Sequence, residues 1–286
     1  MLPADITAVE QGLARTGYLA DEGLATALFL AVRMGAPLLL EGEPGVGKTE
    51  AAKALATTLD TPLLRLQCYE GLTAAEALYE WNYPRQLLAI RLAESRGTTV
   101  AEADLFSPDY LLARPLLAAI DHPGPRPAVL LIDEVDRADD EFEAFLFELL
   151  GEGTVTIPEL GTRTARVRPV ALLTSNRTRD LHDALKRRCL YHFISYPGQE
   201  RVAEIIRRRV PGAAAPLADR VANAVQRLRE LDLTKVPGVA EAIAWARALQ
   251  ALGVSTWDSA TAARTLGAVL KYDEDLTIAR DAGLPT

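Results

Sequence analysis

The sequence has few cysteines and histidines and no long hydrophobic run, and each shortage excludes a class of protein. Its 286 residues contain two cysteines, Cys68 and Cys189, which we interpret as reduced thiols rather than a disulfide framework. The cysteines lack C-x-x-C spacing and the three histidines stand singly, so we expect no structural metal site built on them. The longest uncharged apolar run, residues 23–32, falls well short of the roughly 20 residues that span a bilayer.

Positive charge is also in short supply. Lys and Arg number 31 against 39 Asp and Glu, which gives a formal net charge of −8. An acidic chain has no diffuse attraction to phosphate backbones or anionic membranes, so nucleic-acid binding would need a local basic patch. Residues 1–10 carry Asp5 and Glu10 and lack the basic start and apolar core of a signal peptide, so we expect a cytoplasmic protein.

The chain does contain enough apolar residues, 49%, to build a core. Short apolar runs bounded by turn or helix signals predict four buried strands, at residues 37–40, 63–68, 129–132 and 170–174. Helical stretches lie between them, and this alternation predicts a parallel sheet covered on both faces, an α/β sandwich. After Pro197 only helical stretches remain, at residues 200–210, 217–231, 239–252 and 256–271, so we place a domain boundary there.

Two segments interrupt this alternation. Residues 70–121 form an insertion that carries an aromatic cluster, Tyr79, Trp81 and Tyr83. The cluster is either an exposed binding surface or part of a local core, and the sequence leaves both open. Residues 154–157 and 165–168 flank a Pro-Glu-Leu-Gly turn region and predict a β-hairpin.

Residues 42–49 fit the pattern G-x-x-x-x-G-K-[ST], between a predicted strand and a predicted helix. Glycines let the backbone curl so that successive N–H groups point at a polyphosphate, and the helix N-terminus adds partial positive charge. Lys48 is expected to reach the β- and γ-phosphates, and Thr49 to bind Mg²⁺ through its hydroxyl. The predicted nucleotide-binding residues are Gly42, Glu43, Pro44, Gly45, Val46, Gly47, Lys48, Thr49 and Glu50.

The strand at residues 129–132 ends in two carboxylates, Asp133 and Glu134. In nucleotide hydrolases the first acid of such a pair supports Mg²⁺ and the second orients or deprotonates the attacking water. An acidic pair after a strand is commonly just solvated, but together with the Lys48 loop it predicts an ATP or GTP hydrolase.

Polar and basic residues follow the next strand. Asn176 ends the strand at residues 170–174 and is expected to contact the γ-phosphate or the water, because parallel strands end at the same sheet edge. Further on, Arg188, or in second place Arg187, is too far along the chain to serve its own nucleotide easily. Either arginine could complete the site of a neighbouring subunit as an arginine finger. Basic clusters at helix ends are often just solvated or balance the helix dipole, so this role depends partly on the resemblance that follows.

These motifs resemble those of AAA+ ATPases over residues 18–198. Residues 42–49 match the Walker A motif, 130–134 match Walker B, Asn176 falls at sensor 1 and Arg188 at the arginine finger. Within AAA+ the chain resembles the MoxR group, which has an insertion in its second helix and a hairpin before sensor 1, here about residues 70–86 and 154–168. Residues 18–24, 79–85 and 188–192 are similar to the CoxD-like branch.

The resemblance implies a P-loop AAA+ α/β domain in residues 1–197, followed by a small all-helical lid domain in 198–286. It also implies a ring, usually a hexamer, that uses ATP and Mg²⁺ to act like a chaperone on a metalloenzyme, commonly with a von Willebrand A-domain partner. CoxD-like proteins are associated with maturing the metal centre of carbon monoxide dehydrogenase and related molybdenum hydroxylases. One departure concerns sensor 2: the MoxR group has Ser-Pro-Arg where residues 235–241 read Lys-Val-Pro-Gly-Val-Ala-Glu, with Lys235 and Arg247 as the nearby cations.

Two other functions compete with this one. A DNA-remodelling AAA+ ATPase would need a basic patch, and the candidate residues are Arg163, Arg166, Arg168, Arg177 and Arg179. The net charge of −8 and the absence of a known DNA-binding module weigh against nucleic acid. A monomeric kinase or GTPase is compatible with the phosphate loop, but the chain has no N-K-x-D guanine signature.

Overall fold

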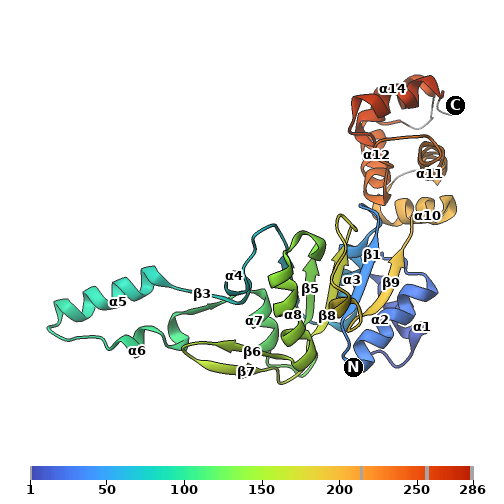
Figure 1. Cartoon of the computed structure of the whole chain (residues 1–286). Helices are drawn as coiled ribbons and strands as arrows, with labels where there is room; N and C mark the ends of the chain where they lie inside the picture. Colours follow the sequence, from blue (N-terminus) through green and yellow to red (C-terminus); the bar gives the residue numbers. More distant parts are fainter. Residues whose placement is uncertain (1, 213–214, 255–257, 284–286) are drawn as a thin grey trace. The chain divides into compact units, whose positions relative to one another are not determined.

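A computed structural model describes residues 2–212, 215–254 and 258–283 (Figure 1). The chain divides into two compact units. The first comprises residues 1–12, 21–41 and 52–192, and the second comprises residues 13–20, 42–51 and 193–286.

A five-stranded sheet with strand order β2-β5-β8-β1-β9 organises the first unit (Figure 1). Strands β2 and β1 pair in parallel with β5 and β8, respectively, and β5 pairs in parallel with β8. All residues of β1, β5 and β8 are buried, which requires cover on both faces of the sheet. The predicted parallel α/β sheet is therefore confirmed, with strands β1 (Leu38–Gly42), β2 (Leu63–Gln67), β5 (Val129–Asp133), β8 (Val170–Ser175) and β9 (Leu190–Ile194).

Helices cover the sheet because their apolar residues recur on one side. Leu117 of α7 (Pro115–Ile120) and Leu146 of α8 (Asp140–Glu152) are fully buried in one hydrophobic cluster with Leu130 and Leu173 of the sheet. Asp139 caps α8, since its carboxylate accepts from Phe142 N at 2.9 Å. The first unit also contains all of α2 (Glu22–Met34) and the short α9 (Asp183–Lys186). It contains most of α1 (Ile6–Arg15) and of α3 (Lys48–Leu59).

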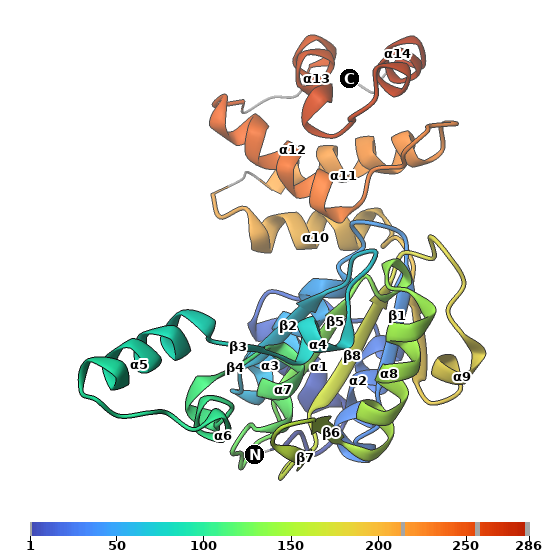
Figure 2. The same cartoon turned by 60° about the vertical axis from the view of Figure 1, so that its left-hand side comes forward.

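The insertion forms an arm that extends from the sheet in both views (Figures 1 and 2). Its base is the antiparallel pair β3 (Tyr79–Trp81) and β4 (Leu111–Ala113). Between and beside these strands lie α4 (Ala74–Leu78), α5 (Tyr83–Ser95), α6 (Glu102–Leu105) and a 3₁₀ turn at Pro108–Tyr110. We call residues 79–113 the insert arm.

The predicted hairpin is present, with a shorter turn than expected. Strand β6 (Thr154–Ile157) pairs with β7 (Gly161–Thr164) rather than with residues 165–168. Gly161 has φ +76°, a left-handed conformation that closes the turn directly after Ile157 and lets the second strand start there.

The C-terminal part of the second unit is helical, as predicted. Helices α10 (Gln199–Arg209), α11 (Ala215–Arg229) and α12 (Val239–Ala251) share a core in which Trp245 is fully buried and donates to Thr265 Oγ1 at 2.8 Å. The stretch predicted at 256–271 begins outside the described residues. Within it lie α13 (Ser259–Thr265) and a 3₁₀ turn at Leu266–Ala268, and α14 (Asp273–Asp281) follows.

Candidate active site

The glycine-rich loop of the second unit leads from the end of β1 into α3. Gly45 and Gly47 have φ +79° and +102°, which side-chain-bearing residues rarely adopt. The side chain of Lys48 is turned back on the loop, where Nζ donates to Gly42 O at 2.6 Å and to Glu43 O at 2.9 Å. A lysine folded over a curled backbone of this kind is the arrangement in which P-loops hold phosphate groups.

The start of helix α12 supports this loop within the same unit. Val239 N donates to Gly45 O at 3.0 Å, and a Cβ on Gly45 would lie 3.3 Å from the Cα of Gly238. Glu241 accepts from Gly238 N at 3.0 Å, so a carboxylate stands in the stretch where the MoxR group has Ser-Pro-Arg. Of the two nearby cations, the backbone N–H of Lys235 donates to buried Asp275, and Arg247 donates to Arg209 O at 3.3 Å.

In the first unit a buried threonine joins the two predicted catalytic acids. Thr174 Oγ1 donates to Asp133 Oδ1 at 2.5 Å and accepts from Glu134 N at 2.9 Å. Arg65 of β2 donates to Asp133 Oδ2 through Nη2 at 2.6 Å. Asp133 is buried while Glu134 is partly exposed, so the second carboxylate is the one that water can reach.

The backbone at the two strand ends is bent in the same way. Glu134 has φ +56° and Arg177, which follows Asn176, has φ +59°. Non-glycine residues seldom adopt this left-handed conformation, and where they do the surrounding contacts hold them there. Asn176 N donates to Asp136 Oδ2 at 3.2 Å, so the sheet brings the segments of Asn176 and Glu134 together as predicted from adjacent strands.

The family model described as "AAA domain (dynein-related subfamily)" matches residues 37–189, more than half of the chain. The chain belongs to this family. The expected AAA+ membership is thereby confirmed, and the dynein-related family includes the MoxR group. Membership of the CoxD-like branch stays a prediction.

Several known proteins are similar to this AAA domain protein. The "denitrification regulatory protein NirQ" of Pseudomonas aeruginosa is 25% identical over 209 residues, covering 71% of this chain and 70% of NirQ. A structure of a RuvB variant from Thermotoga maritima is 18% identical with a TM-score of 0.51, covering 93% of this chain and 71% of that chain. A second Thermotoga RuvB structure, described as a Holliday junction branch migration motor, is 16% identical with a TM-score of 0.49, covering 90% and 68% of the two chains. At 18% identity, the likeness to the RuvB variant shows the fold alone.

The predicted arginine finger of this AAA domain is not brought to the acid pair. Arg188 Nη1 donates to Phe147 O at 2.5 Å, and its guanidinium lies 5.7 Å from the centre of the Phe147 ring. Gly151 of α8 makes room for it, because a Cβ there would lie 2.6 Å from Arg188 Nη1. Arg188 precedes β9 and therefore lies near the start of that strand, whereas Asp133 ends β5. Arg187 is exposed beside it.

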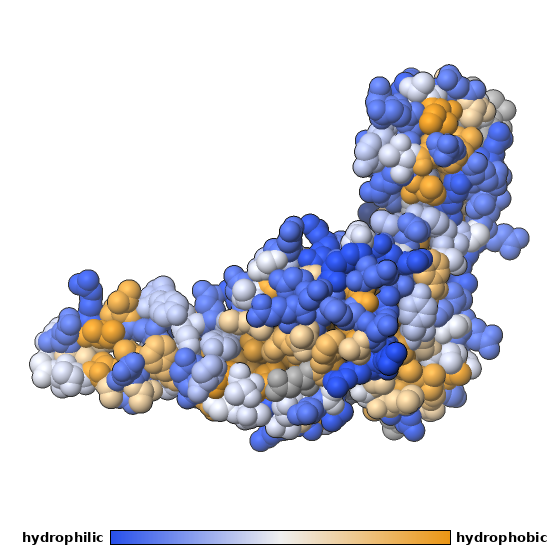
Figure 3. All heavy atoms as spheres, viewed as in Figure 1, coloured by the Kyte–Doolittle hydropathy of each residue, from blue (hydrophilic) through white to orange (hydrophobic). Residues whose placement is uncertain are grey.

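The aromatic cluster of the insertion is divided between core and surface. Trp81 is 6% exposed and packs edge-on against Tyr79 and Phe106, with ring centroids 5.8 and 5.2 Å apart. Tyr83 is exposed and begins α5, whose exposed apolar side chains are visible as orange atoms at the left of Figure 3. The exposed leucines of α5 are Leu87, Leu88 and Leu92. The local-core interpretation therefore holds for Trp81 and not for Tyr83.

Most of the candidate DNA-binding arginines of the AAA domain face acceptors on their own chain. Arg163 pairs with Asp121 and Arg177 with Glu41, each at 3.8 Å. Arg168 Nη2 donates to Glu152 O at 3.4 Å, and Arg179 pairs with the fully buried Glu143. These contacts reduce the positive charge that the group would present to a phosphate backbone.

Sequence reasoning missed several residues that shape the site. Thr174, Asp136 and Glu41 are all buried, and Glu41 accepts from Tyr191 Oη at 3.0 Å. Burial and the Glu41 contacts raise the pKa of Tyr191 above its ordinary value. The only sequence signal for these residues is their position at or just beyond the ends of apolar strands.

Among the described residues, no helix is long and apolar enough to cross a membrane.

Proposed function

We propose that this AAA domain protein is a ring-forming ATPase of the MoxR type. Two observations, one in each unit, support the proposal: the second unit has a curled Lys48 loop after β1, and in the first unit β5 ends in an acid pair bridged by Thr174. Family membership supports the same conclusion, since AAA domains are P-loop domains. In this proposal residues 1–197 bind the nucleotide and the helical residues 198–286 form a lid.

The residues present fit ATP with Mg²⁺. Carboxylate and hydroxyl oxygens are preferred Mg²⁺ ligands, and Asp133 and Thr49 supply one of each. Thr174 and Arg65 each hold one oxygen of the Asp133 side chain and so fix its orientation. The ion, when bound, neutralises charge on the phosphates.

The chain's own residues divide the remaining work. Residues 42–50, which include Lys48, bind the phosphates. Asn176 orients the γ-phosphate or the water. Glu134 orients and deprotonates the water, for which its partial exposure and its strained backbone are suited. Arg188, or Arg187, completes the site of the next subunit. The guanidinium of Arg188 contacts Phe147 of α8 rather than the acid pair of its own subunit. Contacts of this head-to-tail kind close into rings, and we propose a hexamer.

The client in this proposal is a metalloenzyme, as the resemblance to the MoxR group and its CoxD-like branch implies. The likeness to NirQ, a regulatory protein of denitrification by its name, supports placement near the MoxR group. A von Willebrand A-domain protein is the proposed partner. The exposed face of α5 is the proposed client contact, with Tyr83 and Leu87 among its residues.

The first test measures ATP turnover per subunit across protein concentration while the mass of the assembly is recorded with ATP bound. The variants are Glu134→Gln and Arg188→Ala, and Arg126→Lys is the control because the Arg126 side chain donates to Leu59 O and to Asp60. We expect turnover to rise with assembly, to collapse in both variants and to persist in the control. A monomer that turns over ATP at full rate, with Arg188→Ala unchanged, would refute the ring and favour a kinase-like function.

Magnesium removal gives a second test of the same site. Chelation with EDTA should abolish turnover and excess Mg²⁺ should restore it, because Asp133 and Thr49 are the proposed ligands. Lys48→Ala should lose nucleotide binding itself, measured by equilibrium dialysis, whereas Glu134→Gln should retain it. Retained binding in Lys48→Ala would exclude the phosphate role of the loop.

A further inference from the structure

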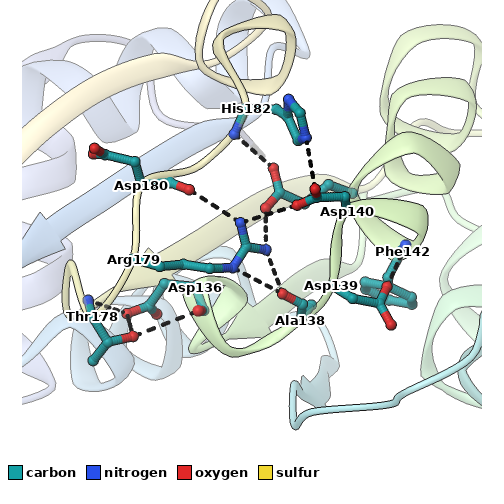
Figure 4. Close-up of polar contacts among 10 residues, drawn as sticks. Asp136, Ala138, Asp139, Asp140, Phe142, Thr178, Arg179, Asp180 and His182 are labelled. Atoms are coloured by element: carbon teal, nitrogen blue, oxygen red, sulfur yellow. Dashed lines mark hydrogen bonds and ion pairs between the residues drawn. The ribbon is translucent and has the colours of Figure 1, made fainter.

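Residues 176–182 are the segment that joins Asn176 to the proposed arginine finger. The segment starts where β8 ends and leads into α9, after which come Arg187 and Arg188. It has no helix or strand of its own. Figure 4 shows that its side chains and backbone instead contact the residues just after the acid pair and the start of α8.

The first half of the segment is held by Asp136, two residues beyond Glu134. Asp136 is 2% exposed, and its Oδ2 accepts from Asn176 N at 3.2 Å, from Thr178 N at 2.8 Å and from Thr178 Oγ1 at 2.6 Å. The residue between these two amides, Arg177, has the strained left-handed backbone noted above. A single buried carboxylate therefore fixes the path of the chain directly after Asn176.

The second half is held by an ion pair between Arg179, whose side chain is 33% exposed, and the fully buried Glu143 of α8. Arg179 Nε donates to Ala138 O at 3.1 Å and Nη1 donates to Asp180 O at 3.1 Å, while Nη2 contacts Glu143 Oε1. The second oxygen of Glu143 accepts from His182 N at 2.9 Å. Glu143 is fully buried, so its charge depends on these partners.

The arrangement places His182 N, held by Glu143, immediately before α9. Helix α9 is a single turn without a side-chain cap, and it is held by the fully buried Leu185 together with contacts at its ends. The residues after it, Arg187 and Arg188, are exposed. The segment that Arg179 and Glu143 hold therefore sets where α9 and the two arginines begin, and the Phe147 contact then holds the guanidinium of Arg188.

We propose that the Arg179–Glu143 pair is a positioning device that presents Arg187 and Arg188 to the neighbouring subunit and ties them to the acid pair through Asp136. The inference rests on the proposed ring ATPase and adds two residues to it. Arg179 does not touch the nucleotide in this scheme; it acts on the site of the next subunit through the finger arginine. Any defect in Arg179 should therefore be repaired by a neighbour with an intact pair.

Mixed assemblies test this directly. The donor-defective subunit carries Arg179→Lys, which keeps the charge but loses the forked bonds, or the double change Arg179→Met with Glu143→Leu, which leaves no unpaired buried charge. The second subunit carries Glu134→Gln, which cannot hydrolyse its own ATP but keeps its finger segment. Arg188→Ala mixed with Glu134→Gln is the positive control, and Arg126→Lys is the matched arginine control, since Arg126 also bonds to two carbonyls and a carboxylate.

Alone, the Arg179 variants should lose kcat by about tenfold or more, as is expected of Arg188→Ala, with KM for ATP and assembly mass unchanged. Mixing with excess Glu134→Gln should restore most of the turnover per Arg179-variant subunit. Lost turnover that mixing does not restore, while the Arg188→Ala mixture recovers, would overturn the proposal because Arg179 would then serve its own site. Full activity of both Arg179 variants would overturn it too. Full activity of Arg188→Ala alone would instead refute the ring function on which it rests.

Discussion

Thr174 is one side chain that serves both proposed catalytic acids. Its hydroxyl donates to Asp133 and accepts from the backbone of Glu134, so Thr174→Val keeps the shape and removes both bonds. We expect turnover to fall at least about tenfold and the free energy of unfolding to fall by about 1–3 kcal/mol, since Glu134 N and the buried Asp133 carboxylate each lose a hydrogen bond. Thr174→Ser should restore both, as measured by turnover and urea unfolding. Full activity of Thr174→Val would remove the bridge from the mechanism.

The buried thiol of Cys68 should make the free energy of unfolding depend on pH in the alkaline range. Its thiol is fully buried, and burial, followed by the charges of Asp133 and Asp136, raises its pKa from 9.0 to about 12. The folded state thus holds a proton that the unfolded state releases above pH 9, so the stabilisation present below pH 9 is lost as pH rises towards about 12. The slope is about 1.4 kcal/mol per pH unit for this thiol.

Urea unfolding between pH 8 and pH 10.5 checks this slope, with Cys68→Ala expected to flatten it relative to the parent chain. Cys189, whose pKa burial also raises to about 12, gives a second and independent contribution. An equal slope in Cys68→Ala would show that the Cys68 thiol titrates normally. The same burial keeps both thiols protonated at neutral pH, which agrees with their lack of a proposed chemical role.

At the scale of elements, α8 contains a glycine that a helix would normally avoid. Gly151→Ala should raise helix stability by about 1 kcal/mol, but its Cβ would meet Arg188 Nη1 and displace it from Phe147 O. We expect the two effects to offset each other in the wild-type background. In the Arg188→Ala background the stabilisation of about 1 kcal/mol should appear in thermal unfolding. Equal effects in both backgrounds would show that the Arg188 side chain does not pack against Gly151 of α8.

Helix α5 gives the opposite case, apolar residues that stabilise nothing in the described chain. Leu88 and Leu92 lie one turn apart and are 59% and 46% exposed, so Leu88→Glu with Leu92→Glu should change the free energy of unfolding by less than about 0.5 kcal/mol. The fully buried Leu117→Ala of α7 is the comparison and should cost about 2–5 kcal/mol. Binding of a hydrophobic dye should fall in the α5 variant. A large loss of stability there would show that α5 is packed in solution.

The elements also show which features the sequence could predict. Strands β1, β5 and β8 are uniformly apolar because both faces of the sheet are covered, and their runs were visible for that reason. Strand β9 alternates instead and exposes Tyr191 and Phe193, so it did not resemble a buried strand. In the sequence, three residues resemble ordinary surface charges: Asp136, Glu143 and Arg179. Only the tertiary contacts of the folded chain bury or pair them. The P-loop and the acid pair were predictable because phosphate binding requires fixed residue types at fixed spacing.

At the scale of the whole molecule, the net charge decides between remodelling a protein and remodelling DNA. The chain carries −8, and four of its five candidate patch arginines already contact acceptors in the first unit. Within this candidate patch, counterion release, the main source of affinity for a duplex, is therefore opposed by contacts that these arginines already make. We expect no shift of a duplex in a gel at low salt, where electrostatic binding is strongest, with or without ATP. Arg163→Glu together with Arg166→Glu should change neither the gel nor the turnover. A shift that these two changes abolish would revive the DNA function and would place its contact on the β6–β7 hairpin and the residues after it.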